Sequence, residues 1–174
     1  ERMKKSLERL LEGNEFLVEC DVASDESIDT AFEKIKEYAG EIHGVVHAVA
    51  YANKEDLQGA VTEISRDGYA LAQDISAYSL IAVTKAAKPI LAENSGIVTL
   101  TYLGADRAVP NYNMMGIAKA ALESAVRYLA AELSPQKIRV NAISAGAIKT
   151  LAVTGVTDYQ KLIQLSEDRT PDHI

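Results

Sequence analysis

Two tyrosines and a lysine near the middle of the chain have the types and spacing of a site that stabilises negative charge on oxygen. Tyr112 and Lys119 are seven residues apart, which is about two turns of a helix, so a helix would place them on one face. A lysine near a phenol lowers the pKa of the phenol and adds N–H donors. Tyr102 lies ten residues before Tyr112, at the end of an apolar run. Together these groups could hold an oxyanion, although each alone is typical of a half-buried tyrosine or a surface lysine.

Two other apolar runs are also followed by residues that could contact a ligand. Asp21 could accept a hydrogen bond from an adenine amino group while Val22 packs against the ring, or Asp21 could simply open the next helix. The small residues at 48–52 would let a ligand approach the backbone closely, or would serve tight packing against a helix. The residues alone leave both alternatives open at each position.

The loop at 144–150 combines small residues with the Thr150 hydroxyl, which suits a pyrophosphate or a nicotinamide amide, or an ordinary tight turn. His43 and His47 are four apart, which on a helix would suggest a metal pair. The residues between them are typical of a strand, on which four residues span about 13 Å, so we expect no metal site. Cys20 is expected to pack in the core.

Short apolar runs predict strands, and helical periodicity predicts helices between them. Three of the runs are almost continuously apolar, which suits strands that are covered on both faces. The alternation predicts an α/β fold with a doubly wound, Rossmann-like parallel sheet, whose ligands lie beyond the carboxyl ends of the strands. The expected strands are Glu15–Cys20, Gly44–Ala50, Gly96–Tyr102 and Ile138–Ser144; the expected helices are Glu1–Glu12, Ser27–Ala39 after a cap at Ser24 or Asp25, about Arg66–Leu91, and about Tyr112–Leu133.

Length and composition restrict the class of protein. A chain of 174 residues predicts a single domain over 1–174. The net charge of −7 argues against nucleic-acid binding, and no apolar run reaches the ~18 residues of a membrane span. The single cysteine fits a reducing compartment, so we expect a cytoplasmic protein. The helical pattern at 1–12 begins without a cap, and 166–174 contains no closing element, which predicts a fold that is incomplete at the N- and C-terminus.

The segment Asn111–Ala120, preceded by Thr99–Ala105, closely resembles bacterial enoyl-acyl-carrier-protein reductases, a divergent branch of the short-chain dehydrogenase/reductase superfamily. The Tyr-x6-Lys pair, with a second tyrosine ten residues upstream, is specific to this branch. Related alcohol dehydrogenases and ketoreductases use Tyr-x3-Lys, and the residue four before Lys119 is Met115. The likeness extends over essentially the whole chain and includes 20–22, 74–79, 139–146 and 148–152.

The resemblance implies an NADH-dependent reduction of a trans-2-enoyl chain, carried by acyl carrier protein, in type II fatty acid biosynthesis. It leaves NADPH open as the cofactor. Tyr112 would hydrogen-bond the thioester carbonyl, and Lys119 would hold the nicotinamide ribose and strengthen Tyr112 as a donor. Tyr102 would line the acyl site, and Ala52 would touch substrate through its backbone.

The resemblance also implies where the cofactor and a partner subunit lie. Asp21 and Val22 would hold adenine, and Val49 would lie along the cofactor. The nicotinamide and pyrophosphate would be covered by Ile148, Lys149, Thr150, Leu151 and Ala152. The family assembles as a homotetramer.

The first strand, the glycine-rich loop and the final strand of the family are missing from 1–174. We therefore expect this chain alone to bind NADH poorly, with activity belonging to a longer protein. Two alternatives are a catalytically inactive fragment and a related short-chain oxidoreductase that acts on carbonyls. Met115 argues against the second of these, because methionine cannot replace the tyrosine acid.

Overall fold

The computed structural model describes residues 16–146 and 159–168. Its centre is a sheet of three parallel strands in the spatial order β1 (Ile42–His47), β2 (Leu91–Thr101), β3 (Arg139–Ser144). Because all three strands run in the same direction, their carboxyl ends meet at one edge of the sheet.

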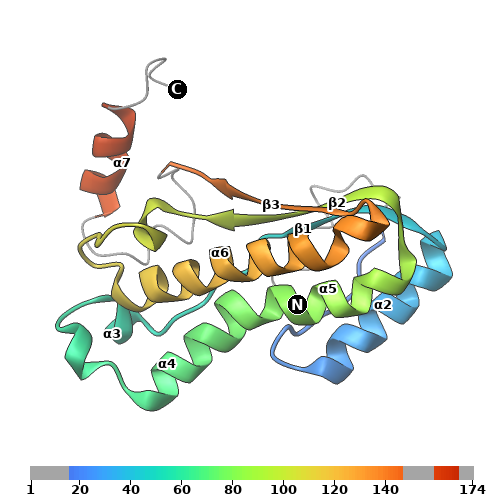
Figure 1. Cartoon of the computed structure of the whole chain (residues 1–174). Coiled ribbons are helices and arrows are strands. Elements are labelled where there is room, and N and C mark those ends of the chain that lie inside the picture. The colour runs from blue at the N-terminus through green and yellow to red at the C-terminus, as the bar shows by residue number, and fades with distance from the viewer. Residues whose placement is uncertain (1–15, 147–158, 169–174) are drawn as a thin grey trace.

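The larger helices pack on one face of this sheet (Figure 1). They are α2 (Asp25–Ala39), α4 (Arg66–Gln73), α5 (Ser79–Ala87) and α6 (Asn113–Leu133). Shorter elements connect them: α3 (Lys54–Leu57), the 3₁₀ turns η1 (Val61–Glu63), η3 (Lys88–Ile90), η4 (Leu103–Ala105) and η5 (Ser134–Gln136), the π-helical turn η2 (Asp74–Tyr78), and α7 (Tyr159–Glu167). Within the described ranges, none of the helices has both the length and the apolar character that crossing a membrane requires.

The main apolar core lies between the sheet and helices α5 and α6. Leu80 of α5, Ile97 of β2 and Leu122 of α6 are each 0% exposed and belong to one cluster. A smaller cluster around Ile28 joins α2 to α5. The two clusters fix α5 and α6 against the sheet and so determine where the first residues of α6 lie.

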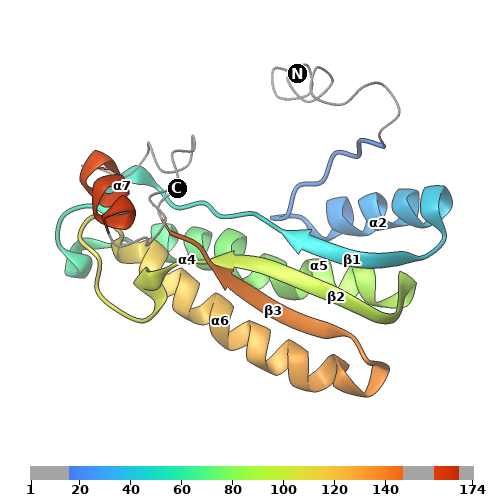
Figure 2. The same ribbon diagram turned by 90° about the horizontal axis from the view of Figure 1, so that it is seen from above.

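The predicted strand Glu15–Cys20 is wrong, because residues 16–20 have no regular structure. Figure 2 shows this segment running away from β1 and not along it. A strand needs a hydrogen-bonding neighbour, and here Phe16 instead stacks on Tyr38 of α2 with the ring centroids 4.3 Å apart. The prediction for Cys20 is also wrong: its side chain is exposed and does not pack in the core.

The other elements are present, with shifted boundaries. β1 ends at His47 and not at Ala50, and β2 starts five residues earlier than the predicted Gly96. Its early part contains a register irregularity, and Asn94 there has a φ of 65°. The long helix predicted to end at Leu91 is divided by the π turn and stops at Ala87, before Pro89, which has no amide hydrogen to continue it.

The second face of the sheet differs from the expectation that both faces are covered. Val46, Leu100 and Ile143 are 74%, 40% and 53% exposed, one from each strand. The described helices that cover the sheet all lie on the opposite face (Figure 1). The apolar character of the strands therefore exceeds what the described part of the chain buries.

A buried polar network ties the end of β1 to β2 and α5. His47 is 3% exposed; its Nδ1 lies 3.0 Å from Thr99 Oγ1, and its Nε2 lies 2.8 Å from Ser79 Oγ. Burial, assisted by the charge of Lys119, lowers the pKa of His47 from 6.5 to about 4. The ring is therefore neutral in the folded protein at pH 7.

This neutral histidine makes the stability of the fold depend on pH. In the unfolded chain His47 takes up a proton near pH 6.5, whereas in the folded chain it does so near pH 4, so the unfolded state gains protons first as the pH falls. We expect wild type to lose about 2 kcal/mol of unfolding free energy between about pH 7.5 and pH 5 through this group. Urea unfolding at the two pH values measures the loss.

The matched variants are His47→Asn and His43→Asn. His43 has a side chain that is 80% exposed, so its replacement should leave the pH dependence as in wild type. His47→Asn should lower stability at pH 7.5 and remove most of the pH dependence. An unchanged pH dependence in His47→Asn would contradict the assignment.

Candidate active site

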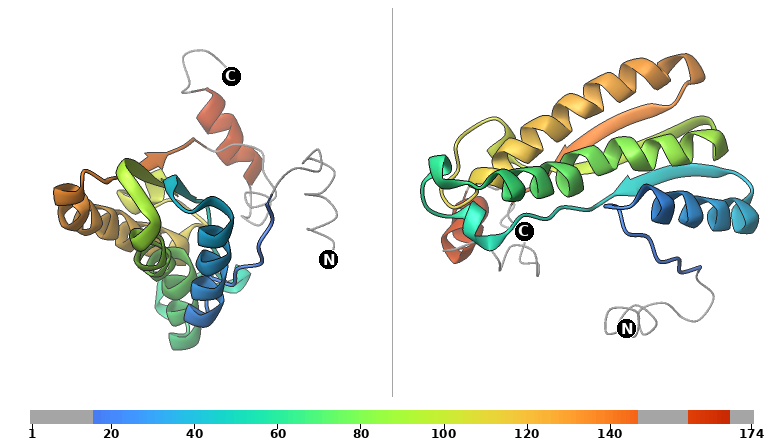
Figure 3. Two further views of the ribbon diagram at one scale, coloured as in Figure 1. Left: turned by 90° about the vertical axis from the view of Figure 1, so that its right-hand side faces the viewer. Right: turned by 90° about the horizontal axis from the view of Figure 1, so that it is seen from below.

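The tyrosines predicted to take part in the chemistry lie where β2 ends and α6 begins. Tyr102 follows the last residue of β2, and Tyr112 is the residue immediately before α6. The chain between them forms η4 and a loop that returns to the helix. In Figures 2 and 3 this loop, α3 and the start of α4 lie at the same end of the molecule.

The two tyrosine rings are in direct contact. Their centroids are 4.9 Å apart and their planes are inclined at 69°, which is an edge-to-face arrangement. Burial, and then the neighbouring Tyr102, raise the pKa of Tyr112 well above its ordinary value. Tyr112 therefore remains protonated at any ordinary pH and can act as an O–H donor.

The structure corrects the expectation that Lys119 lowers the pKa of Tyr112, because burial has the larger effect and raises it. Lys119 lies in α6 and is 6% exposed. Its Nζ donates to the Leu100 carbonyl oxygen at 2.7 Å. Burial also lowers the pKa of Lys119.

One turn further along α6, Glu123 anchors the helix to the same strand. Thr101 Oγ1 donates to Glu123 Oε1 at 2.7 Å, and Thr101 is 7% exposed. Lys119 and Glu123 thus hold α6 against two consecutive residues at the end of β2. Both contacts act on the backbone and side chains that directly precede Tyr102.

Two glycines allow the turn after β2 to lie against α6. A Cβ on Gly104 would be 2.5 Å from Cδ1 of Tyr112 and 3.5 Å from Cδ1 of Tyr102. A Cβ on Gly116 would be 2.8 Å from the carbonyl oxygen of Gly104. The ring of Tyr112 therefore rests on a surface that any larger residue at Gly104 would occupy.

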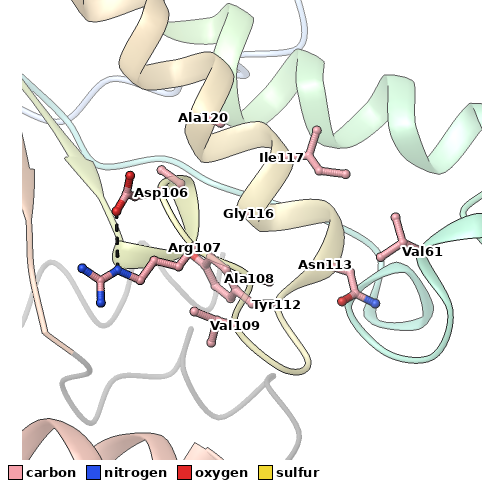
Figure 4. A pocket seen from close by; sticks show the side chains of 12 residues that line it. Val61, Asp106, Arg107, Ala108, Val109, Tyr112, Asn113, Gly116, Ile117 and Ala120 are labelled. Carbon is pink, nitrogen blue, oxygen red and sulfur yellow. Dashed lines mark hydrogen bonds and ion pairs between the residues drawn. The ribbon is translucent and has the colours of Figure 1, made fainter.

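A cavity of about 350 Å³ lies beside Tyr112 (Figure 4). Its walls come from η1, the loop after η4, and the first turns of α6. The lining residues include the apolar Val61, Val109 and Ile117 and the polar Arg107 and Asn113 (Figure 4). Tyr112 lines this cavity, whereas Tyr102 and Lys119 do not.

The predicted adenine residues lie in the turn that leads into α2. Asp21 is exposed; its Oδ1 accepts from the Ala23 N–H at 3.0 Å, and its own N–H donates to Ser27 Oγ at 2.8 Å. Val22 packs partly buried against the cluster of α2 and α5. The helix-opening alternative for Asp21 is thus present, and the carboxylate still faces solvent.

The remaining predicted residues divide into two groups. Val49 and Ala52 are partly buried in the segment after β1, and Ala52 packs against Ala72 and Met114. The predicted cover of the cofactor, Ile148, Lys149, Thr150, Leu151 and Ala152, lies outside the described residues.

Two buried serines of the π turn and its boundary, Ser76 and Ser79, carry no functional prediction from the sequence; the structure places them against Tyr51 and His47. From the sequence, His47 is a candidate only as a metal ligand. The available signal was two serines within a mainly apolar run at 75–83.

The described residues fit a nicotinamide cofactor at this edge. Lys119 is a buried ammonium with three N–H donors, of which Leu100 uses one, so two can meet ribose hydroxyls. Asp21 offers an exposed carboxylate in the turn that leads into α2, and α2 begins near the end of β1 (Figure 2). A parallel α/β sheet with a protonated tyrosine and a buried lysine at its carboxyl edge defines an oxidoreductase of the short-chain dehydrogenase/reductase class.

A family model described as "Enoyl-(Acyl carrier protein) reductase" matches residues 1–173. The chain belongs to this family. It is 67% identical over 172 residues to the NADH-dependent enoyl-[acyl-carrier-protein] reductase FabI of Enterococcus faecalis, covering 99% of this chain and 69% of the relative. It is 50% identical over 175 residues to the NADPH-dependent FabI of Staphylococcus aureus, covering 98% of this chain and 68% of that protein.

Solved structures of the same kind superimpose closely. The Bacillus cereus enoyl-acyl carrier protein reductase, solved with NADP+ and an indole naphthyridinone, has a TM-score of 0.92 at 51% identity, over 98% of this chain and 67% of that one. The NADH enzyme of Aquifex aeolicus also has a TM-score of 0.92, at 43% identity, over 99% and 68%. These neighbours confirm the predicted Rossmann-like fold.

The contact between Gly104 and Tyr112 can be tested by adding one methyl group. We expect Gly104→Ala to lower the unfolding free energy by about 1–3 kcal/mol, because the ring of Tyr112 must move. The matched control is Gly96→Ala in β2, where the new Cβ would be 3.4 Å from the movable end of Arg139. Thermal unfolding measures the loss, and near-ultraviolet circular dichroism reports the tyrosine rings, since the chain has no tryptophan. Equal effects in the two variants would contradict this packing argument.

Proposed function

We propose that this chain reduces trans-2-enoyl groups carried by acyl carrier protein to saturated acyl groups, with NADH, in type II fatty acid biosynthesis. The observation that carries the proposal is the protonated, half-buried Tyr112 in edge-to-face contact with Tyr102, in a chain of the enoyl reductase family. NADPH is also compatible with this proposal, because a relative named as NADH-dependent and one named as NADPH-dependent both match nearly the whole chain.

Tyr112 supplies the oxyanion donor. Its O–H donates to the thioester carbonyl oxygen and stabilises the negative charge that grows there as the β-carbon is reduced. The nicotinamide supplies the hydride when bound. Because burial keeps Tyr112 protonated, its O–H can donate this hydrogen bond throughout the ordinary pH range.

Lys119 and Tyr102 support that donor. Lys119 holds the ribose hydroxyls with the donors that Leu100 does not use, and its charge favours negative charge on the substrate oxygen. Tyr102 packs edge-to-face on Tyr112 and lines the acyl site. Asp21 and Val22 hold the adenine, and Val49 lies along the cofactor.

A carbonyl-reducing function is less well supported. The position four before Lys119, where ketoreductases of the class carry tyrosine, holds Met115, which is 8% exposed and has no O–H to donate.

In the proposed enoyl site, Ala52 contacts substrate through its backbone.

The partners are the enoyl-loaded acyl carrier protein and further copies of this chain, assembled as a homotetramer in the cytoplasm. Large side chains exposed on the outer helices support assembly, because pairing would remove them from water. They are Tyr69, Tyr78, Ile81, Ile117 and Tyr128. Light scattering after gel filtration tests the assembly, and a monomer would contradict it.

The function is tested first by replacing the donor. Tyr112→Phe removes the O–H and should lower the rate of enoyl reduction about 10²–10³-fold, the usual cost of one oxyanion donor, with NADH affinity retained. Tyr128→Phe on the same helix is the matched control, since Tyr128 is 78% exposed and should leave the rate unchanged. Lys119→Met should weaken NADH binding as well as turnover. Near-normal turnover by Tyr112→Phe would exclude the proposed role.

The reaction class is tested by offering both substrates to the same preparation. We expect oxidation of NADH with a trans-2-enoyl thioester and none with the matching 3-ketoacyl thioester, because Met115 supplies no acid for a ketone. Absorbance of NADH measures both reactions. Preference for the ketone would overturn the assignment.

A further inference from the structure

The π-helical turn η2 faces the end of β1 with two buried hydroxyls. Ser76 and Ser79 are both 0% exposed, and they lie within and directly after the turn. A π turn contains one residue more than an α turn, so it changes which side chains the helix presents before and after it. Before the turn, α4 buries Gly68 and Ala72; after it, α5 buries Leu80 with its neighbours in the main core.

Ser76 forms hydrogen bonds with the backbone of Tyr51, a residue that lies outside the strands. Its Oγ accepts from the Tyr51 N–H at 2.8 Å and donates to the Tyr51 carbonyl oxygen at 2.8 Å. Tyr51 lies in the irregular segment after β1, and its side chain is 51% exposed. The hydroxyl therefore holds the backbone of this segment and not its ring.

Ser79 performs a similar task one turn later. Its O–H donates to the Ile75 carbonyl oxygen at 2.6 Å, and the same oxygen lies 2.8 Å from Nε2 of His47. Thr99 lies 3.0 Å from the other ring nitrogen. The last residue of β1 is thus held between the next strand and the beginning of α5.

We propose that the π turn positions the segment 48–52 for ligand binding, with Ser76 as the residue that fixes the backbone on which Val49 and Ala52 are carried. The inference rests on the proposed function for the roles of Val49 and Ala52. Ser76 touches neither cofactor nor substrate and acts through Tyr51. The two hydrogen bonds to one residue hold both its amide and its carbonyl in a segment that has no strand ladder to do so.

The first test uses unmodified protein and does not depend on activity. We expect the Tyr51 amide to exchange slowly with deuterium in native-state NMR, although the segment lacks regular structure, because Ser76 accepts its hydrogen. The Tyr69 amide, bonded to the Ser65 carbonyl in the first turn of α4, provides a helical reference. Exchange of Tyr51 at the rate of an exposed loop amide would overturn the proposal.

The second test separates positioning from stability. Ser76→Ala should weaken NADH binding about tenfold, as loss of two ordered hydrogen bonds allows, while kcat at saturating NADH stays within about twofold. The matched control is Ser95→Ala in β2, where the hydroxyl is also buried, at 3% exposed, and has no hydrogen-bond partner among the described residues. Its NADH affinity should equal that of wild type.

The outcomes distinguish this proposal from the proposed function. Enoyl reduction by wild type, together with unchanged NADH affinity in Ser76→Ala, would overturn the positioning role alone. Absence of enoyl reduction in wild type would count against the function, while the exchange rate of Tyr51 would still decide whether Ser76 holds this segment. If Ser76→Ala fails to fold, the exchange rate of the Tyr51 amide in wild type decides the proposal by itself.

Discussion

The contact between the turn after β2 and the first turns of α6 leaves no space for a side chain. Gly104 and Gly116 meet there, and the ring of Tyr112 covers Gly104. The close approach of this turn to α6 determines where Tyr112 lies relative to Tyr102 and to the cavity. The anchoring of α6 through Lys119 depends on the same approach, because Tyr112 directly precedes the helix that carries Lys119.

Burial has opposite effects on the two chemical groups of that helix. It raises the pKa of Tyr112 and lowers the pKa of Lys119, and in each case it favours the neutral form. For a tyrosine the neutral form is the hydrogen-bond donor, so burial suits the task of stabilising an oxyanion. For the lysine, a hydrogen bond to the Leu100 carbonyl keeps the group oriented at the end of β2.

The polar interior of this fold is concentrated at the end of β1. His47, Ser79 and Thr99 form one network, and Ser76 holds the next segment of the chain. Buried polar groups are costly unless they are paired, and here the π turn supplies the hydroxyls that pair them. Irregular backbone at the edge of the sheet can therefore be as well ordered as the strands beside it.

The amino-acid sequence by itself determined the parallel α/β class, the helices α2 and α6, and the residues Tyr102, Tyr112 and Lys119, because local periodicity and motif spacing carry that information. Only the tertiary structure decided that residues 16–20 form no strand, that Cys20 is exposed, and that burial outweighs Lys119 at Tyr112. Each of these depends on which neighbours the folded chain brings near, and no local pattern encodes them. The pairing of Ser76 with Tyr51 is of the same kind, since 25 residues separate the two in the sequence.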